Sequence, residues 1–159
     1  MKFIKGMNQF LRNVCTTLLI LMTCLVIFQV VSRKFLGISI AQVEEIARYC
    51  MIWVGLLGAG ICVISKAHIA VEVVRDQFPP KIKKIATMVS YILMFLFFSI
   101  LIYYGSDLVN SSMMQFSPSM PWLKMGYVMS VVPLMGIIGN INIVYLIIDE
   151  FIVKKEKSE

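Results

Sequence analysis

Residues 39–60 read SIAQVEEIARYCMIWVGLLGAG, and this stretch decides what kind of fold the chain adopts. It places two carboxylates and one arginine, Glu44, Glu45 and Arg48, directly before a long uncharged apolar segment. On a helix Arg48 lies one turn from both acids, so it can pair with Glu44 or with Glu45. Charge is costly inside a bilayer. We therefore predict a helix with its charged end at the membrane surface and its apolar end inside the membrane.

Three more uncharged runs support a membrane protein. The chain has 159 residues, of which 59% are hydrophobic and only 15% charged. The four uncharged runs contain 20, 17, 22 and 24 residues, at 13–32, 49–65, 85–106 and 125–148. A helix needs roughly 17–25 apolar residues to cross a bilayer. We predict one all-α integral membrane domain over 1–159 with four transmembrane helices. Short interfacial amphipathic segments are expected at about 1–12, 39–48 and 110–124.

The basic residues predict the orientation of these helices. Eleven of the 15 lysines and arginines lie in the N-terminus, the loop between the second and third helices, and the C-terminal tail. Loops rich in lysine and arginine stay in the cytoplasm, so both termini are predicted to be cytoplasmic. The first apolar run is too long for a typical signal peptide and has no cleavage site of the A-x-A type. We interpret it as an uncleaved signal anchor.

Small residues continue the charged face of the second helix into the membrane. Gly55, Ala59, Cys62 and Lys66 lie within about 60° of Glu44 at 100° per residue. Small residues at such spacing allow two helices to approach closely. This stripe fits packing within the chain's own bundle and packing against a partner subunit equally well. In the fourth helix, Asn140 and Asn142 point in roughly opposite directions. We expect both to be hydrogen-bonded within the chain; the alternative is that one of them bonds to a partner.

The same sequence argues against several functional classes. The four predicted spans contain no aspartate, glutamate, lysine, arginine or histidine, which a pump or proton-coupled exporter needs. His68 is the only histidine, so one chain cannot supply a bis-histidine haem site. His68 and Glu72 alone make a poor metal site, and we expect His68 to form a structural hydrogen bond. We predict no catalytic, metal, cofactor or substrate site and no nucleic-acid binding.

Residues 32–74, SRKFLGISIAQVEEIARYCMIWVGLLGAGICVISKAHIAVEVV, carry a resemblance to a known family. They resemble the signature region of the small membrane subunits of tripartite ATP-independent periplasmic (TRAP) transporters, the DctQ family. The matching features are Arg33, the Glu44–Glu45 pair, Arg48, Trp53 and the Gly58–Ala59 pair, with His68 following. The four predicted helices extend the resemblance over the whole chain.

The resemblance implies a non-catalytic subunit of the bacterial inner membrane. In such systems a periplasmic binding protein captures an organic acid, such as a dicarboxylate, a sialic acid or another sugar acid. It delivers this acid to a large membrane subunit that carries the substrate and sodium sites. The small subunit contacts the large one and helps to hold it in the bilayer. The small subunit is itself in contact with membrane lipid. The alternative is a non-catalytic scaffold or assembly factor of another inner-membrane complex, which would not purify with a large polytopic transporter.

Two sets of site residues follow from these arguments. The predicted interface with the large subunit comprises Arg33, Glu44, Glu45, Arg48, Trp53, Gly55, Ala59, Cys62, Lys66 and His68. The predicted platform for the binding protein lies in the uncharged loop before the fourth helix and comprises Met113, Met114 and Trp122.

Overall fold

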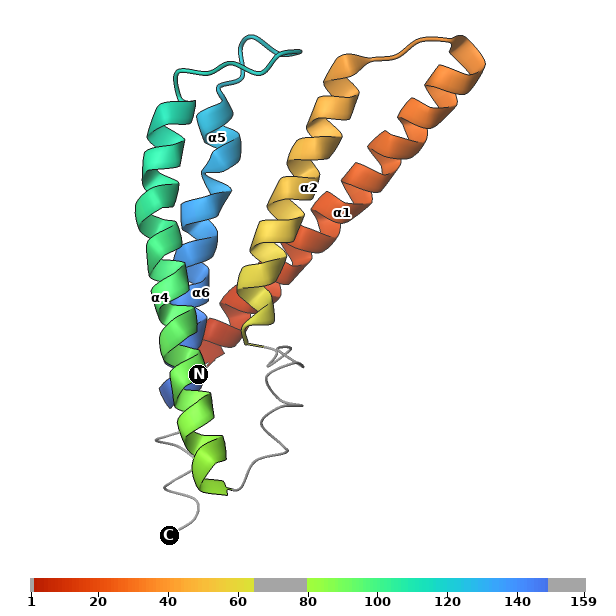
Figure 1. The fold of residues 1–159 in the computed structure, drawn as a ribbon. Helices are drawn as coiled ribbons and strands as arrows, with labels where there is room; N and C mark the ends of the chain where they lie inside the picture. The colour runs from red at the N-terminus through yellow and green to blue at the C-terminus, as the bar shows by residue number, and fades with distance from the viewer. Residues whose placement is uncertain (1, 65–79, 149–159) are drawn as a thin grey trace.

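A computed structural model describes residues 2–64 and 80–148, and these residues form five α-helices (Figure 1). The helices are α1 (Lys2–Leu36), α2 (Ala41–Cys62), α4 (Pro80–Ser112), α5 (Met125–Met129) and α6 (Val131–Ile148). The described residues contain no strand, and a single isolated bridge joins Phe116 to Lys124. The predicted all-α fold is confirmed.

Within the described residues, four segments are long and apolar enough to cross a membrane, as predicted. They are Ile4–Leu36, Ala41–Cys62, Ile85–Ser112 and Met125–Ile148. The fourth segment combines α5 and α6, which are separated only at Ser130. Proline has no N–H, and its ring clashes with the carbonyl four residues earlier. Pro133 therefore explains why regular helix is interrupted at Ser130, next to the Met129 carbonyl.

The helices form two antiparallel hairpins, α1–α2 and α4 with α5–α6, which Figure 1 shows close together at one end and diverging toward the other. We call the end with residues 37–40 and 113–124 the loop end, and the opposite end the terminal end. The contact between α2 and α6 joins the hairpins, and α1 packs mainly on α2. Gly37, with a φ of 66°, ends α1 in a left-handed conformation that favours glycine.

The buried core lies where α2, α4 and α6 meet. One cluster contains Val63, Tyr91, Phe98, Met135, Ile143 and Leu146. A second contains Leu57, Val131 and Ile138, with Leu11 and Trp53 packed against it. Glycine allows α4 and α6 to approach closely, because a Cβ on Gly136 would lie 2.9 Å from the carbonyl oxygen of Phe98.

The first two predicted interfacial segments are continuous with the helices that follow them. Residues 2–12 and 41–48 form no separate helices, since they are the first turns of α1 and α2. The chain has no proline or glycine between Met7 and Leu36 or between Ala41 and Val54, so nothing breaks either helix there. At 1.5 Å per residue α1 is about 52 Å long, longer than the ~30 Å hydrocarbon core. It must tilt or extend beyond the membrane.

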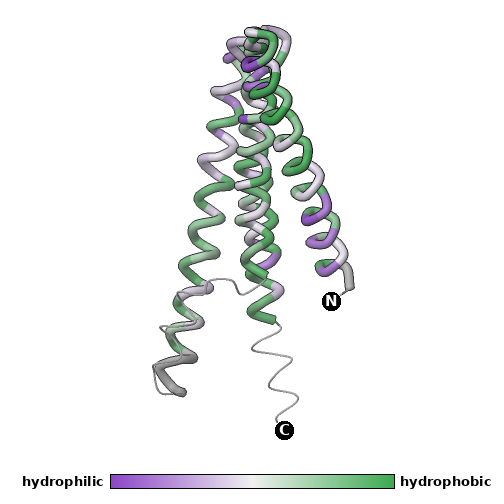
Figure 2. The backbone as a smooth tube through the Cα atoms, turned by 90° about the vertical axis from the view of Figure 1, so that its right-hand side faces the viewer, coloured by the Kyte–Doolittle hydropathy of each residue, from purple (hydrophilic) through white to green (hydrophobic). Residues whose placement is uncertain are grey.

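Large apolar side chains are exposed along α1 and α4. Ile27 and Phe28 on α1 are 58% and 53% exposed, and Leu93 and Leu96 on α4 are 59% and 56% exposed. Figure 2 shows that hydrophobic residues continue along most of the length of the long helices. So much exposed apolar surface is unusual for a soluble protein and fits helices surrounded by lipid or by another subunit.

Candidate partner interface

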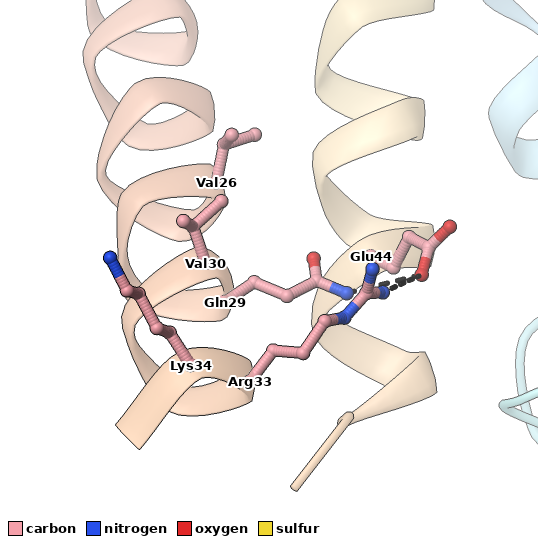
Figure 3. Close-up of a pocket in the computed structure, with 6 residues that line it drawn as sticks. All are labelled: Val26, Gln29, Val30, Arg33, Lys34 and Glu44. Atoms are coloured by element: carbon pink, nitrogen blue, oxygen red, sulfur yellow. Dashed lines mark hydrogen bonds and ion pairs between the residues drawn. The ribbon is translucent and has the colours of Figure 1, made fainter. Parts of the chain in front are cut away.

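A cluster of charges joins the two helices of the first hairpin at the loop end. Glu44 on α2 accepts a hydrogen bond from the Gln29 side chain of α1 at 3.1 Å. Its carboxylate also lies 4.0 Å from the Arg33 guanidinium and 3.7 Å from that of Arg48. Figure 3 shows Gln29 and Arg33 reaching from α1 toward Glu44. The predicted pair of Glu44 with Arg48 is confirmed. Glu44 has two further partners on α1, Gln29 and Arg33, which the spacing within one helix does not reveal.

These ion pairs contribute little to stability. The side chains of Arg33, Arg48 and Glu44 are 65%, 60% and 50% exposed. Exposed ion pairs of this kind typically contribute only about 0–1 kcal/mol in double-mutant cycles. Their positions at the surface therefore leave them available for contacts outside the chain.

Glu45 has a different environment from its neighbour. It is 6% exposed, and its carboxylate accepts a hydrogen bond from the Tyr49 hydroxyl and one at 3.0 Å from the backbone N–H of Ser119. Pairing between Glu45 and Arg48, which the spacing allowed, is not found. Glu45 lies about 100° around α2 from Glu44, beneath the loop that follows α4. A buried carboxylate needs donors there, and the loop supplies one.

Trp53 also acts within the chain. Its indole Nε1–H donates a hydrogen bond to the Val128 carbonyl of α5 at 3.1 Å, and its side chain is half-buried against the core. Together with Glu45, Trp53 ties the loop-end half of α2 to the second hairpin. Helical spacing could not reveal either partner, because Ser119 and Val128 contribute backbone atoms and lie about 75 residues farther along the chain.

The small-residue stripe on α2 is exposed. Gly55, Ala59 and Cys62 all lie at the surface, and a Cβ added at Gly55 would meet no atom within 4 Å. The close approach between α2 and α6 uses Gly60 instead, where an added Cβ would lie 3.4 Å from the Met135 carbonyl oxygen. The alternative in which the stripe packs within the chain's own bundle is therefore not observed. Lys66 and His68 lie outside the described residues.

The loop of residues 113–124 has a fixed shape with an exposed apolar tip. Hydrogen bonds from Ser117 N–H to the Leu123 carbonyl and from Met125 N–H to the Gln115 carbonyl, both 2.9 Å, hold it. Met114 and Trp122 are 87% and 77% exposed. Met113 instead packs over Gly126, where an added Cβ would lie 2.7 Å from its side chain. The three predicted platform residues thus divide into two at the tip and one beneath it.

A buried amide network lies toward the terminal end. Asn142 on α6 is fully buried and donates hydrogen bonds to the Asn8 side chain at 3.0 Å and to the Gly60 carbonyl at 2.9 Å. It also accepts a bond from Asn8 at 2.8 Å. Asn140 donates to the Ser99 hydroxyl at 3.2 Å, and its own oxygen has no partner among the described residues. The expected internal hydrogen bonding is confirmed for Asn142 and met in part for Asn140.

The described residues offer no constellation for metal chemistry. Within 2–64 and 80–148, no three histidine, cysteine, aspartate or glutamate side chains gather where they could hold an ion. All four cysteines are free, and Cys50 is buried beside the core.

Comparisons with known proteins agree with the resemblance carried by residues 32–74. The profile of the family described as tripartite ATP-independent periplasmic transporters, DctQ component, matches residues 22–152. Two Haemophilus influenzae proteins described as TRAP transporter small permease proteins are similar to this chain. One is 37% identical over 73 residues, 46% of this chain and 45% of the relative. The other is 27% identical over 119 residues, 75% and 72% of the two chains.

A third relative is much longer than this chain. The sialic acid TRAP transporter permease protein SiaT of Haemophilus influenzae is 26% identical over 112 residues. The match covers 70% of this chain and 18% of SiaT. This chain thus matches less than half the length of SiaT and of the first small permease relative.

Proposed function

The chain belongs to the DctQ component family of TRAP transporters, a family of non-catalytic transport subunits, and we propose that it supports a large membrane transport subunit. Together they would carry out sodium-driven uptake of an organic acid that a periplasmic binding protein delivers. The observation that carries this proposal is the uncovered small-residue stripe on α2. A scaffold in an unrelated complex would use the same stripe, and the family profile favours the transport subunit over it.

The stripe of Gly55, Ala59 and Cys62 is suited to a helix of the large subunit. Between transmembrane helices there is little hydrophobic driving force, so association depends on close van der Waals contact. Small exposed side chains permit that contact, and Arg48 and Glu44 at the loop end of the same face can add polar contacts. Glu45 and Trp53, predicted for this interface, instead support it by holding α2 against the second hairpin.

The loop tip is the proposed platform for the binding protein. Met114 and Trp122 project from a loop held by its own hydrogen bonds, and Phe116 beside them is 56% exposed. We place this loop in the periplasm and both termini in the cytoplasm of a bacterial inner-membrane protein, from the distribution of lysine and arginine. The transported acid is proposed only as a class: a dicarboxylate, a sialic acid or another sugar acid.

A co-purification experiment tests the assembly. A tagged chain is extracted from native membranes in mild detergent, and its partners are identified by mass spectrometry. We expect a large polytopic membrane protein in stoichiometric amount. The double variant Gly55→Leu/Ala59→Leu should lose most of this partner, because leucine side chains keep the helices apart.

The matched control is Gly6→Leu on α1. Gly6, like Gly55, has no atom within 4 Å of an added Cβ, so the control repeats the glycine-to-leucine half of the double variant at an exposed site away from the stripe. The control should retain the partner, and both variants should keep the helical content of the unmodified chain. Full recovery of the partner with Gly55→Leu/Ala59→Leu would show that the stripe is not the interface.

A further inference from the structure

A cavity of about 500 Å³ opens at the loop end of the first hairpin. It is lined by Val26, Gln29, Val30, Arg33 and Lys34 of α1 and by Glu44 of α2. Small-molecule sites typically enclose about 300–1,000 Å³, so the space suits a ligand of moderate size. In Figure 3, the Lys34 side chain and the Arg33–Glu44 pair lie to either side of Val30, and Val26 lies one turn farther along α1. The cavity therefore has an apolar floor with a cation on either side.

The polar part of this cavity is positively charged. Arg33 and Lys34 contribute two cations and Glu44 contributes one carboxylate, which leaves one net positive charge. Arg33 lies 4.0 Å from Glu44, and Lys34 forms no ion pair with any described residue. A guanidinium has five N–H donors and matches phosphate in a bidentate geometry. Donors thus remain free at the end of α1, and one phosphodiester would balance the net charge.

The apolar part lies on the membrane side of these cations. Val30 and Val26 come three and seven residues before Arg33, so they share its helix face at about 4.5 Å and 10 Å along the axis. They are 60% and 44% exposed, and α1 is apolar enough to cross a membrane. The end of such a helix lies at the level of the lipid headgroups, with hydrocarbon below it.

We propose that this cavity binds an anionic glycerophospholipid of the phosphatidylglycerol type. The phosphate contacts Arg33 and Lys34, and the first carbons of an acyl chain lie against Val30 and Val26. Glu44 is a positioning residue, because its contacts with Arg33 and Gln29 keep the guanidinium beside the cavity. The lipid would lie at the loop-end edge of the stripe on α2. This inference does not depend on the proposed partner subunit.

Binding can be measured on the full-length chain in detergent by titration with phosphatidylglycerol and native mass spectrometry. The double variant Arg33→Gln/Lys34→Gln should raise the dissociation constant for phosphatidylglycerol about tenfold, because the charge-assisted contacts with the phosphate are lost. The control Lys5→Gln/Arg12→Gln removes the same charge from exposed sites nearer the other end of the same helix, and should bind as the unmodified chain does. Val30→Trp, which fills the apolar floor without changing charge, should also weaken binding.

Several results would overturn the inference. Equal weakening in both charge variants would show general attraction between a basic protein and an acidic lipid. Unchanged binding of phosphatidylglycerol to Arg33→Gln/Lys34→Gln would exclude the cavity as the lipid site. Phosphatidylethanolamine or phosphatidylcholine binding as tightly as phosphatidylglycerol would contradict the charge argument. Equally tight binding of glycerophosphoglycerol, which lacks acyl chains, would show a phosphate site without a lipid site. Circular dichroism of each variant confirms that it is folded.

Discussion

Glu44 and Glu45 are adjacent in the sequence and differ in almost every physical respect. Glu44 is half exposed among arginines, whereas Glu45 is buried and binds the backbone of a loop more than 70 residues away. Removing an exposed ion pair changes little, because water solvates the partner that remains. Removing a buried acceptor leaves donors without partners. The two neighbours therefore give opposite predictions for the same substitution.

Glu45→Ala should lower the free energy of unfolding by about 1–3 kcal/mol, because the Ser119 N–H and the Tyr49 hydroxyl lose their acceptor. The measurement is thermal or denaturant unfolding in detergent, combined with amide hydrogen exchange of residues 113–124. Exchange in this loop should accelerate.

Glu44→Ala is the control for this prediction and should change stability by no more than about 1 kcal/mol. It should leave hydrogen exchange in the loop unaltered. If Glu44→Ala destabilised the chain as much as Glu45→Ala does, the structural assignment of the two acids would be wrong.

At the scale of the helix, glycines with the same helical propensity have different roles. Gly136 on α6 faces the backbone of α4, where an added Cβ would lie 2.9 Å from the Phe98 carbonyl oxygen and 3.2 Å from the Ile102 nitrogen. Backbone atoms cannot turn aside as a side chain can, so the two helices would have to separate. Gly55 on α2 faces open space. Packing between α4 and α6 therefore depends on the glycine at position 136.

Gly136→Ala should destabilise the chain by about 1–3 kcal/mol, the usual effect of overpacking, despite the better helix propensity of alanine. Gly55→Ala, the matched control, should be neutral or stabilise by up to about 1 kcal/mol. Both can be measured by unfolding in detergent under identical conditions. A neutral Gly136→Ala would mean that α4 and α6 are not in such close contact.

At the scale of the whole molecule, the described chain ends at Lys2 and Ile148 lie toward the same end of the helical hairpins (Figure 1). Four spans return the chain to the side on which it began. The loop of residues 113–124 lies at the opposite end, with Met114 and Trp122 exposed. From the excess of lysine and arginine near the termini, we propose that the terminal end faces the cytoplasm.

Trp122→Cys, in a chain whose four cysteines are replaced by alanine, should react with a membrane-impermeant maleimide added to the periplasmic side. Lys5→Cys should react only after the membrane is permeabilised.

Attachment of a bulky maleimide at Trp122→Cys should also reduce uptake without loss of the assembled complex, if the loop receives the binding protein. Labelling of Lys5→Cys alone from the periplasm would reverse the proposed orientation, and unchanged uptake would remove the loop from the platform.

The class of the protein, the number of spans and the helix with charge at its end could all be predicted from the order of the residues. These follow from local properties, since the length of an apolar run and the spacing of Glu44 and Arg48 involve neighbours within one helix. The resemblance at residues 32–74 likewise depends only on the order of residues along the chain. The family profile then agreed with that order.

What surrounds each face of these helices became known from the packing of the two hairpins. Glu45 and Trp53 have the same helical spacing whether they contact a partner subunit or the chain's own loop, and their partners are backbone atoms about 75 residues away. Gly55 and Gly60 are equally small, yet one is exposed and the other lies against α6. Helical periodicity fixes which residues share a face, and the packing of the two hairpins decides which faces they bury.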